Sequence, residues 1–317
     1  MFYDYLKLVR FPNLVIVAAT QYFIRWLVIF PMININHLEF QFSSLDFFLL
    51  VLATVCITAA GYVINDYFDT KTDILNRPEK VIVGKTISRR HAIALHSTLS
   101  IVGVLLGFYV SYRIELPVLG VIFLMASGIL WFYSTTYKRQ FLVGNFIVAI
   151  MTALVPFIVV IYEIPPLNKE YGEILLRQHV NFNYIIAWVG GFSLFAFLLT
   201  LIREIVKDAE DFEGDKAFGR NTLPIVMGIK FTKTVTYVLV AVTIAGLGLI
   251  YIIFLKDLIS IVYLILTVIL PLLYSTLLIR KAETPIDYHK ISTILKFIML
   301  FGVLYALVIN FIINSKF

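Results

Sequence analysis

The stretch that decides the fold is residues 45–73, "LDFFLLVLATVCITAAGYVINDYFDTKTD", in which an apolar run passes directly into acidic residues. The run is about as long as the ~20 residues that a helix needs to cross a bilayer. In its acidic end, Asn65, Asp69 and Asp73 follow one another at intervals of four residues. On a helix of roughly 3.6 residues per turn they fall within an arc of about 80°. The stretch therefore predicts a spanning helix that ends in a one-sided column of oxygen ligands.

The composition of the whole chain is that of a membrane protein. Of its 317 residues, 60% are hydrophobic and only 15% are charged, whereas a soluble domain of this length needs far more polar surface. Nine apolar segments can be marked, at about 12–32, 46–64, 91–110, 116–136, 141–162, 183–204, 232–254, 258–279 and 291–314. We predict an all-α polytopic membrane protein with nine transmembrane helices, forming one domain over residues 1–317.

The basic residues alternate between two sides if each segment crosses the membrane once. The N-terminus and every second loop carry most of the 26 Lys and Arg residues. Only five lie on the other side: Arg113, Lys169, Arg177, Lys256 and Lys316. By the positive-inside rule we expect a cell (inner) membrane protein whose N-terminus and acidic loops are cytoplasmic and whose C-terminus is outside. On the outer side, residues 165–183 are expected to form the one sizeable loop, with room for a short surface helix.

Two further features narrow the function. The single cysteine, Cys56, lies within a span, which excludes an intrachain disulfide and a thiolate metal cluster. The net charge of +6 is spread over loops beside apolar runs, so topology explains it better than nucleic-acid binding does. Two cations, Arg25 and Lys296, lie inside apolar segments, and we expect Arg25 to face the bundle interior.

A second acidic stretch, "KDAEDFEGD" at 207–215, follows the sixth apolar segment. If that helix continues, Asp208, Asp211 and Asp215 fall within an arc of about 60°. Two carboxylate columns on one membrane face repel each other unless a cation lies between them. Oxygen ligands without His or Cys suit Mg²⁺, which shares its coordination with substrate phosphates. We therefore predict an Mg²⁺ site whose ligands come from both stretches.

Cationic residues near these acids complete a site for a diphosphate. Lys138, Arg139, Arg77 and Arg203 are placed to hold its outer oxygens, and Lys207 opens the second stretch. Aromatic side chains close to the motifs, Tyr133 among them, offer ring faces to a cation. One acidic cluster alone would more often be a solvated helix cap. Two clusters at helical spacing on one face favour a functional site, because acids near the bilayer are costly.

Four segments resemble the UbiA superfamily of intramembrane prenyltransferases. Residues 65–88, "NDYFDTKTDILNRPEKVIVGKTIS", resemble its N-D-x-x-D-x-x-x-D motif, and residues 203–225, "REIVKDAEDFEGDKAFGRNTLPI", resemble its K-D-x-x-D-x-x-G-D motif. "YSTTYKR" at 133–139 and "VRFPN" at 9–13 are similar to two shorter family segments. The match extends over the whole chain and includes the order of the motifs.

The resemblance implies a helical bundle with a central cavity open toward the membrane. It implies that Mg²⁺ and a prenyl diphosphate are held by six residues, namely Asn65, Asp69, Asp73, Asp208, Asp211 and Asp215. It also implies diphosphate contacts from Lys138 and Arg139 and a pocket position for Asn13. We expect Asp69, Asp211 and Lys138 to be the catalytic residues.

The implied activity is Mg²⁺-dependent transfer of a prenyl group from an isoprenyl diphosphate to a lipophilic acceptor, with no obligate protein partner. The second motif looks most like members that prenylate homogentisate, chlorophyllide or geranylgeranylglyceryl phosphate, and we favour the last. An aromatic acceptor of quinone biosynthesis is the alternative. A cation-coupled transporter is a candidate of another class, but it would place acids at the bilayer midplane, whereas here they lie at the ends of spans.

Overall fold

The computed structural model describes residues 2–76, 78–177 and 181–316, which form helices joined by short connections. The helices in chain order are α1 (Phe2–Leu8), α2 (Phe11–Phe23), η1 (Ile24–Ile29), α3 (Phe30–Asn34), α4 (Ser44–Asn76), η2 (Pro78–Lys80), α5 (Arg89–Arg113), η3 (Pro117–Gly120), α6 (Val121–Thr135), η4 (Tyr137–Arg139), α7 (Val143–Arg177), α8 (Asn183–Glu210), α9 (Phe212–Ala217), α10 (Leu223–Ile250), η5 (Tyr251–Leu255), α11 (Leu258–Leu264), η6 (Ile265–Ile269), α12 (Leu270–Lys281) and α13 (Pro285–Lys316). Within the described residues, the one strand-like pairing is a single bridge between Val83 and Ile87.

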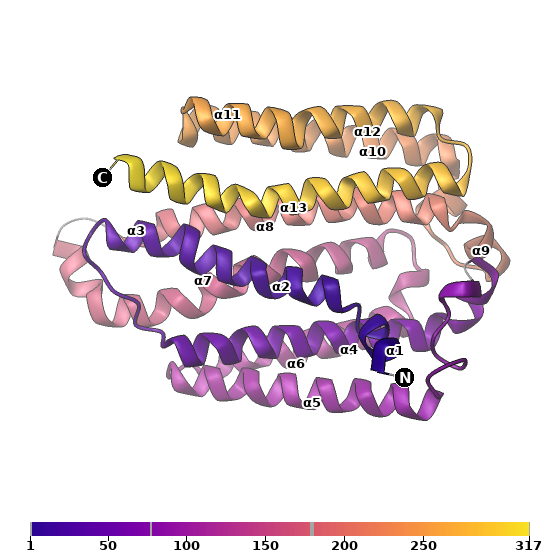
Figure 1. Cartoon of the computed structure of the whole chain (residues 1–317), viewed down its shortest axis with the longest axis horizontal. Helices are drawn as coiled ribbons and strands as arrows, with labels where there is room; N and C mark the ends of the chain where they lie inside the picture. The colour runs from indigo at the N-terminus through magenta and orange to yellow at the C-terminus, as the bar shows by residue number, and fades with distance from the viewer. Residues whose placement is uncertain (1, 77, 178–180, 317) are drawn as a thin grey trace.

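The prediction of an all-α membrane protein is confirmed. Nine helical segments of the described ranges are long and apolar enough to cross a bilayer, and each contains one of the predicted apolar segments or most of it. The chain therefore crosses from one end of the bundle to the other, and α1 and the end of α13 lie at opposite ends (Figure 1). The acidic end of α4 and the short helix α9 lie at the same end as α1 (Figure 1).

The expected outer loop at 165–183 does contain helix, but as the continuation of α7 and not as a separate short surface helix. Helix α7 continues to Arg177 although Pro156, Pro165 and Pro166 lie inside it. Proline removes backbone hydrogen bonds, but a packed helix in a bundle tolerates this where its neighbours hold it in place. The buried Ile164 and Leu167 flank the two adjacent prolines and hold this part of α7 against the bundle.

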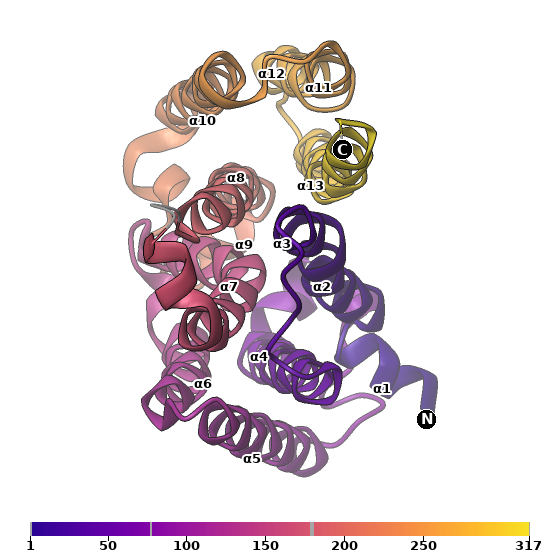
Figure 2. The same cartoon turned by 90° about the vertical axis from the view of Figure 1, so that its left-hand side faces the viewer.

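Five helices surround the middle of the bundle. Seen along the helices, α2, α4, α7, α8 and α13 enclose a central region, with α5 and α6 on one side and α10, α11 and α12 on the other (Figure 2). Contacts join neighbouring members of this ring, including α2 with α4, α7 with α8, and α8 with α13. The two largest of four apolar cores are one built mainly on η1, α3, α4 and α7 and one built mainly on α8 and α13. Trp188 and Phe192 of α8 pack against both cores.

A buried ion pair ties the first spanning segment to α7. The guanidinium Nε of Arg25 lies 2.8 Å from Oε1 of Glu163, and both side chains are no more than 1% exposed. Arg25 also donates to the backbone carbonyl of Phe42, in the connection that leads into α4. The expectation that Arg25 faces the bundle interior is thus met. Charges at membrane depth are stable when they pair inside the protein.

We predict that Glu163→Leu lowers the free energy of unfolding by about 3–5 kcal/mol, because Arg25 is then left buried without its partner. Thermal unfolding of the detergent-solubilised protein measures this effect. The double variant Arg25→Met/Glu163→Leu replaces the whole pair by apolar side chains and should recover most of the loss. If the double variant is as unstable as the single variant, the pair is not the source of the effect.

Candidate active site

The first acidic stretch lies on one continuous helix, as predicted. Helix α4 runs to Asn76, so Asn65, Asp69 and Asp73 share one of its faces. All three line a large cavity that opens between the helix ends. Asp69 is the most enclosed of these acids and is 8% exposed. The end of α4 therefore supplies a buried carboxylate with further oxygen ligands one turn before and one turn after it.

The second acidic stretch does not continue as one helix, contrary to the prediction. Helix α8 ends at Glu210, Asp211 has φ −93° and ψ 12°, and α9 begins at Phe212. The backbone N–H of Asp211 still bonds to the carbonyl of Lys207, which caps α8. The chain turns here because α8 has reached the end of the bundle. The turn carries the buried Asp215 toward α4.

Arg220 joins the two stretches directly. Its Nη2 donates to Oδ1 of Asp69 at 2.6 Å and to Oγ1 of Thr72 at 3.0 Å, both on α4. Its Nη1 donates to Oδ1 of Asp215 at 3.1 Å. A guanidinium suits this position because its planar fork can bond two carboxylates at once. Arg220 was not among the predicted site residues, although it lies only five positions after Asp215 in the same motif.

Lys138 is the second cation on Asp69. Its Nζ lies 2.7 Å from Oδ1 of Asp69 and 3.5 Å from Oδ1 of Asn65. The short helix η4 that carries Lys138 lies close to α7, where a Cβ on Gly144 would come within 2.8 Å of the Cα of Lys138. A residue with a side chain would push this turn away. Gly144 is therefore the packing feature that places Lys138 over the acids.

Asp208 and Asp211 are the remaining acids of the second stretch. The amide nitrogen of Asn145 donates to Oδ2 of Asp208 at 2.8 Å, and Asp208 and Asp211 both line the cavity. We call the six acidic and amide side chains of the two stretches the acidic pole, comprising Asn65, Asp69, Asp73, Asp208, Asp211 and Asp215. The acidic pole carries five carboxylates, and Lys138 and Arg220 are among the cations bonded to it.

The electrostatics of the acidic pole reflect this crowding. Burial raises the pKa of Asp73 to about 6, and the neighbouring carboxylates of Asp69, Asp66 and Asp211 add to the shift. Burial likewise raises the pKa of Asp215 to about 6 although Arg220 opposes the shift. Burial lowers the pKa of Lys138, which Asp69 partly offsets. The pole therefore gains from any additional cation that binds between its carboxylates.

The cavity has a volume of about 1190 Å³ and is polar at one end and apolar at the other. This exceeds the roughly 300–1,000 Å³ of ordinary small-molecule sites, so two lipid-like molecules can be accommodated. Its apolar end is formed by residues of α8, α13 and the segments around η5 and η6, such as Phe192, Leu247, Val268 and Tyr305. Acids, cations and an apolar chamber thus share one continuous space.

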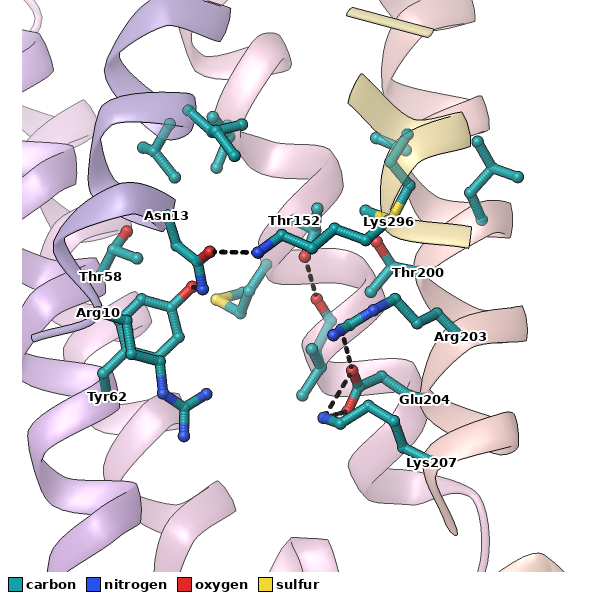
Figure 3. A pocket seen from close by; sticks show the side chains of 18 of the residues that line it. Arg10, Asn13, Thr58, Tyr62, Thr152, Thr200, Arg203, Glu204, Lys207 and Lys296 are labelled. Carbon is teal, nitrogen blue, oxygen red and sulfur yellow. Dashed lines mark hydrogen bonds and ion pairs between the residues drawn. The ribbon is translucent and has the colours of Figure 1, made fainter. Parts of the chain in front are cut away.

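A second polar group lies within the cavity on α2, α4, α8 and α13 (Figure 3). Arg203 and Lys207 both bond to Glu204, at 3.1 and 3.0 Å. Across the cavity, Nη2 of Arg10 donates to Oδ1 of Asp66 at 2.9 Å. Between them, Nζ of Lys296 donates to Oδ1 of Asn13 at 3.1 Å (Figure 3).

The structure brings nearly all of the predicted site residues to this cavity. Those that line it are Asn13, Asn65, Asp69, Asp73, Tyr133, Lys138, Arg203, Lys207, Asp208, Asp211 and Asp215. Arg139 is exposed and is not among the lining residues, and its carbonyl accepts from the backbone of Asn221. Arg77 lies outside the described residues.

Several charged residues that line the cavity were not predicted from the sequence, among them Arg10, Asp66, Glu204, Arg220 and Lys296. A signal was present for Lys296, because a lysine inside an apolar segment is expensive in lipid and points to a functional interior position. Asp66 and Glu204 lie inside the quoted motifs but do not belong to either column of acids spaced at helical intervals. No local signal distinguishes Arg220 from the other basic residues of its loop.

Comparison with known sequences identifies the family. The model of the UbiA prenyltransferase family matches residues 37–310. A digeranylgeranylglyceryl phosphate synthase of Methanosphaera stadtmanae is 31% identical over 256 residues, which are 79% of this chain and 84% of that protein.

Solved structures agree in fold. A structure of a digeranylgeranylglyceryl phosphate synthase, 24% identical, covers 98% of both chains with a TM-score of 0.68. A UbiA homolog from Archaeoglobus fulgidus bound to DMAPP and Mg²⁺, 17% identical, covers 96% of this chain and 99% of that chain with a TM-score of 0.55. Together with the two acidic motifs joined through Arg220, these matches establish that this integral membrane protein belongs to the UbiA prenyltransferase family and is an enzyme of prenyl transfer.

Proposed function

We propose that this enzyme transfers a prenyl group from an isoprenyl diphosphate, bound with Mg²⁺, to geranylgeranylglyceryl phosphate. The observation that carries the proposal is the acidic pole at the mouth of a cavity whose other end is apolar. A diphosphate with a hydrocarbon tail has the same division into a charged and an apolar part. Its head therefore fits the acidic pole, together with a metal, and its tail fits the apolar chamber.

The acidic pole fits Mg²⁺ by the chemistry of its donors. All its ligands are oxygen atoms, which Mg²⁺ prefers. Among the described residues no three acidic, His or Cys side chains converge closely enough to hold a metal by themselves. Mg²⁺ itself usually binds through one or two carboxylates and completes its shell with water and substrate phosphate. When bound, Mg²⁺ neutralises the charge of a departing diphosphate. A homologue of this fold was solved with Mg²⁺ and DMAPP.

The protein's own groups supply the rest of the chemistry. Lys138 and Arg220 offer N–H donors to the outer oxygens of the diphosphate, whose charge increases as it leaves. The apolar chamber holds the tail and keeps water from the allylic carbon. The acceptor's hydroxyl oxygen forms a new bond to that carbon while the bond to the diphosphate breaks, and the hydroxyl proton is released. The products are an ether lipid and pyrophosphate.

The acceptor is proposed from the relatives. The relative from Methanosphaera stadtmanae carries the name digeranylgeranylglyceryl phosphate synthase and matches over most of its length. That product contains a second geranylgeranyl group, so the acceptor is geranylgeranylglyceryl phosphate. An aromatic acceptor of quinone biosynthesis remains the alternative, and the assay below offers both.

We also propose the orientation. The basic loops predict that the N-terminus and the acidic pole face the cytoplasm. Alkaline phosphatase, which is active only outside the cytoplasm, should be active when fused after Phe317 and inactive when fused before residue 1. The reverse pattern would overturn this orientation.

Purified protein in detergent should release pyrophosphate and form the prenylated lipid from labelled geranylgeranyl diphosphate, Mg²⁺ and geranylgeranylglyceryl phosphate. Asp69→Asn and Asp211→Asn should each lower kcat/KM by about 100-fold or more, as expected for removing an electrostatic group at a reacting centre. Glu213→Gln is the matched control, because Glu213 lies on α9 in the same motif but is exposed. Transfer only to aromatic acids would contradict the proposed acceptor, and full activity of both variants would contradict the site.

Arg220→Lys should not preserve the activity of the enzyme, although it keeps the positive charge. An ammonium cannot bond Asp69 and Asp215 at once, as the guanidinium does at 2.6 and 3.1 Å. We expect both Arg220→Lys and Arg220→Gln to lose about tenfold or more in kcat/KM, a loss in the range for one charge-assisted hydrogen bond. Steady-state kinetics with varied donor measure this. A fully active Arg220→Lys would mean that charge alone suffices.

The requirement for Mg²⁺ should depend on pH. Asp73 and Asp215 have pKa values raised to about 6, so both become protonated, and lose the charge that attracts Mg²⁺, as the pH falls through 6. Protons then compete with the metal. The Mg²⁺ concentration for half-maximal activity should rise between pH 7.5 and 5.5, by up to about tenfold per pH unit for each proton displaced. A half-maximal concentration that stays constant below pH 6 would contradict this.

A further inference from the structure

The cavity contains a second charged region, which includes Arg203 and Lys207, two residues predicted from the sequence to contact the diphosphate. We call it the basic pole, comprising Arg10, Arg203, Lys207 and Lys296, all of which line the cavity. Two carboxylates accompany these four cations, namely Asp66 bonded to Arg10 and Glu204 bonded to Arg203 and Lys207. The basic pole thus carries an excess of two positive charges, opposite in sign to the acidic pole.

Lys296 indicates that this excess of positive charge serves to bind a ligand. It lies inside the spanning segment of α13, and its Nζ bonds to the neutral amide oxygen of Asn13. No carboxylate of the described residues forms an ion pair with it. Figure 3 shows its side chain extending into the pocket between α2 and α8. Lys296 is exposed, so its ammonium, which is bonded to a neutral amide, is accessible to an anion that enters the cavity.

The basic pole adjoins the acidic pole, because Lys207 directly precedes Asp208 and Asp66 lies between Asn65 and Asp69, and its Arg203 lies further into the bundle. On α8, Arg203 precedes Asp208 by five residues, which is about 7 Å along the helix axis. On α4, Tyr62 and Asp66, which contact Arg10, lie at or before the turn that carries Asp69. A donor whose head is at the acidic pole extends its tail toward the apolar chamber and so passes the basic pole. The carbon that reacts is the first carbon of that tail.

We propose that the basic pole binds the phosphate of the acceptor lipid, with Lys296 as the residue that selects phosphorylated acceptors. The inference rests on the proposed function. A phosphomonoester carries a charge of about −1.5 to −2 at pH 7, which matches the excess of two positive charges. In a glyceryl phosphate the free hydroxyl is only a few bonds from the phosphate. An acceptor anchored here presents its hydroxyl beside the first carbon of the donor's tail.

Charge also keeps the diphosphate of the donor and the phosphate of the acceptor from exchanging places between the acidic pole and the basic pole. The five carboxylates of the acidic pole repel a phosphomonoester that brings no metal, whereas the basic pole attracts it. Bound phosphate neutralises the basic pole, so that its cations no longer oppose the positive charge that develops on the reacting carbon. A neutral acceptor does not neutralise the basic pole, so its cations continue to oppose the positive charge on the reacting carbon.

The test compares two acceptors that differ only in the phosphate, geranylgeranylglyceryl phosphate and geranylgeranylglycerol. The wild-type enzyme should strongly prefer the phosphorylated lipid. Lys296→Met should raise the KM for it by about ten- to a hundred-fold, as for the loss of a hydrogen bond to a charged group, and should leave the KM for geranylgeranyl diphosphate within about twofold. Its rate with geranylgeranylglycerol should not fall and should rise if anything, because one of the cations that oppose the charge on the reacting carbon has been removed. Lys296→Arg should keep the preference.

Lys290→Met is the matched control, because Lys290 lies on the same helix, is exposed and does not line the cavity. Thermal stabilisation by geranylgeranyl diphosphate and Mg²⁺ checks that each variant is folded and binds the donor. If Lys296→Met keeps the KM and the phosphate preference of the wild type, the inference is wrong. If the KM for the donor rises instead, the basic pole holds the diphosphate. If the wild-type enzyme transfers to no offered acceptor, or only to aromatic acids, the proposed function itself is contradicted, and not the role of the basic pole alone.

Discussion

The arrangement of the site depends on the neutralisation of one buried carboxylate. Asp69 is enclosed where α4 leaves the membrane, and an ionised acid there is stable only with cations in contact. Lys138 and Arg220 supply them, at 2.7 and 2.6 Å. Because these cations come from the turn before α7 and from the connection after α9, satisfying Asp69 draws three distant parts of the chain together. The mouth of the cavity takes its shape from this contact.

From that mouth inward, the cavity changes character in three steps. The acidic pole adjoins the basic pole, whose Arg203 lies about one and a half helical turns before Asp208 on α8, and the apolar chamber lies beyond. Each step suits a different part of the reactants: a metal-bound diphosphate, an anionic head, and hydrocarbon tails. The order follows from helix geometry, because α4 and α8 each carry acids at their ends and basic or aromatic partners one or two turns earlier.

Hydropathy alone was sufficient to predict the spans, because in lipid every backbone polar group must be bonded within a helix. The first acidic column was also predictable, since α4 continues without interruption through Asp73. The second was predicted in the wrong local form, because the pattern of acids does not reveal that the chain turns at Asp211. The helix through Pro165 and Pro166 was missed for a related reason, as burial of Ile164 and Leu167 outweighs the local preference of proline.

What the chain's amino-acid order establishes unaided is therefore the membrane class, the number of spans among the described residues and most of the acids that line the cavity, since these follow from local periodicity and residue chemistry. The partnerships of Arg220 with Asp69 and of Lys296 with Asn13 were decided only by tertiary structure. The members of these pairs are separated by 151 and 283 positions. No local pattern encodes such contacts, because they exist only once the helices have packed around the cavity.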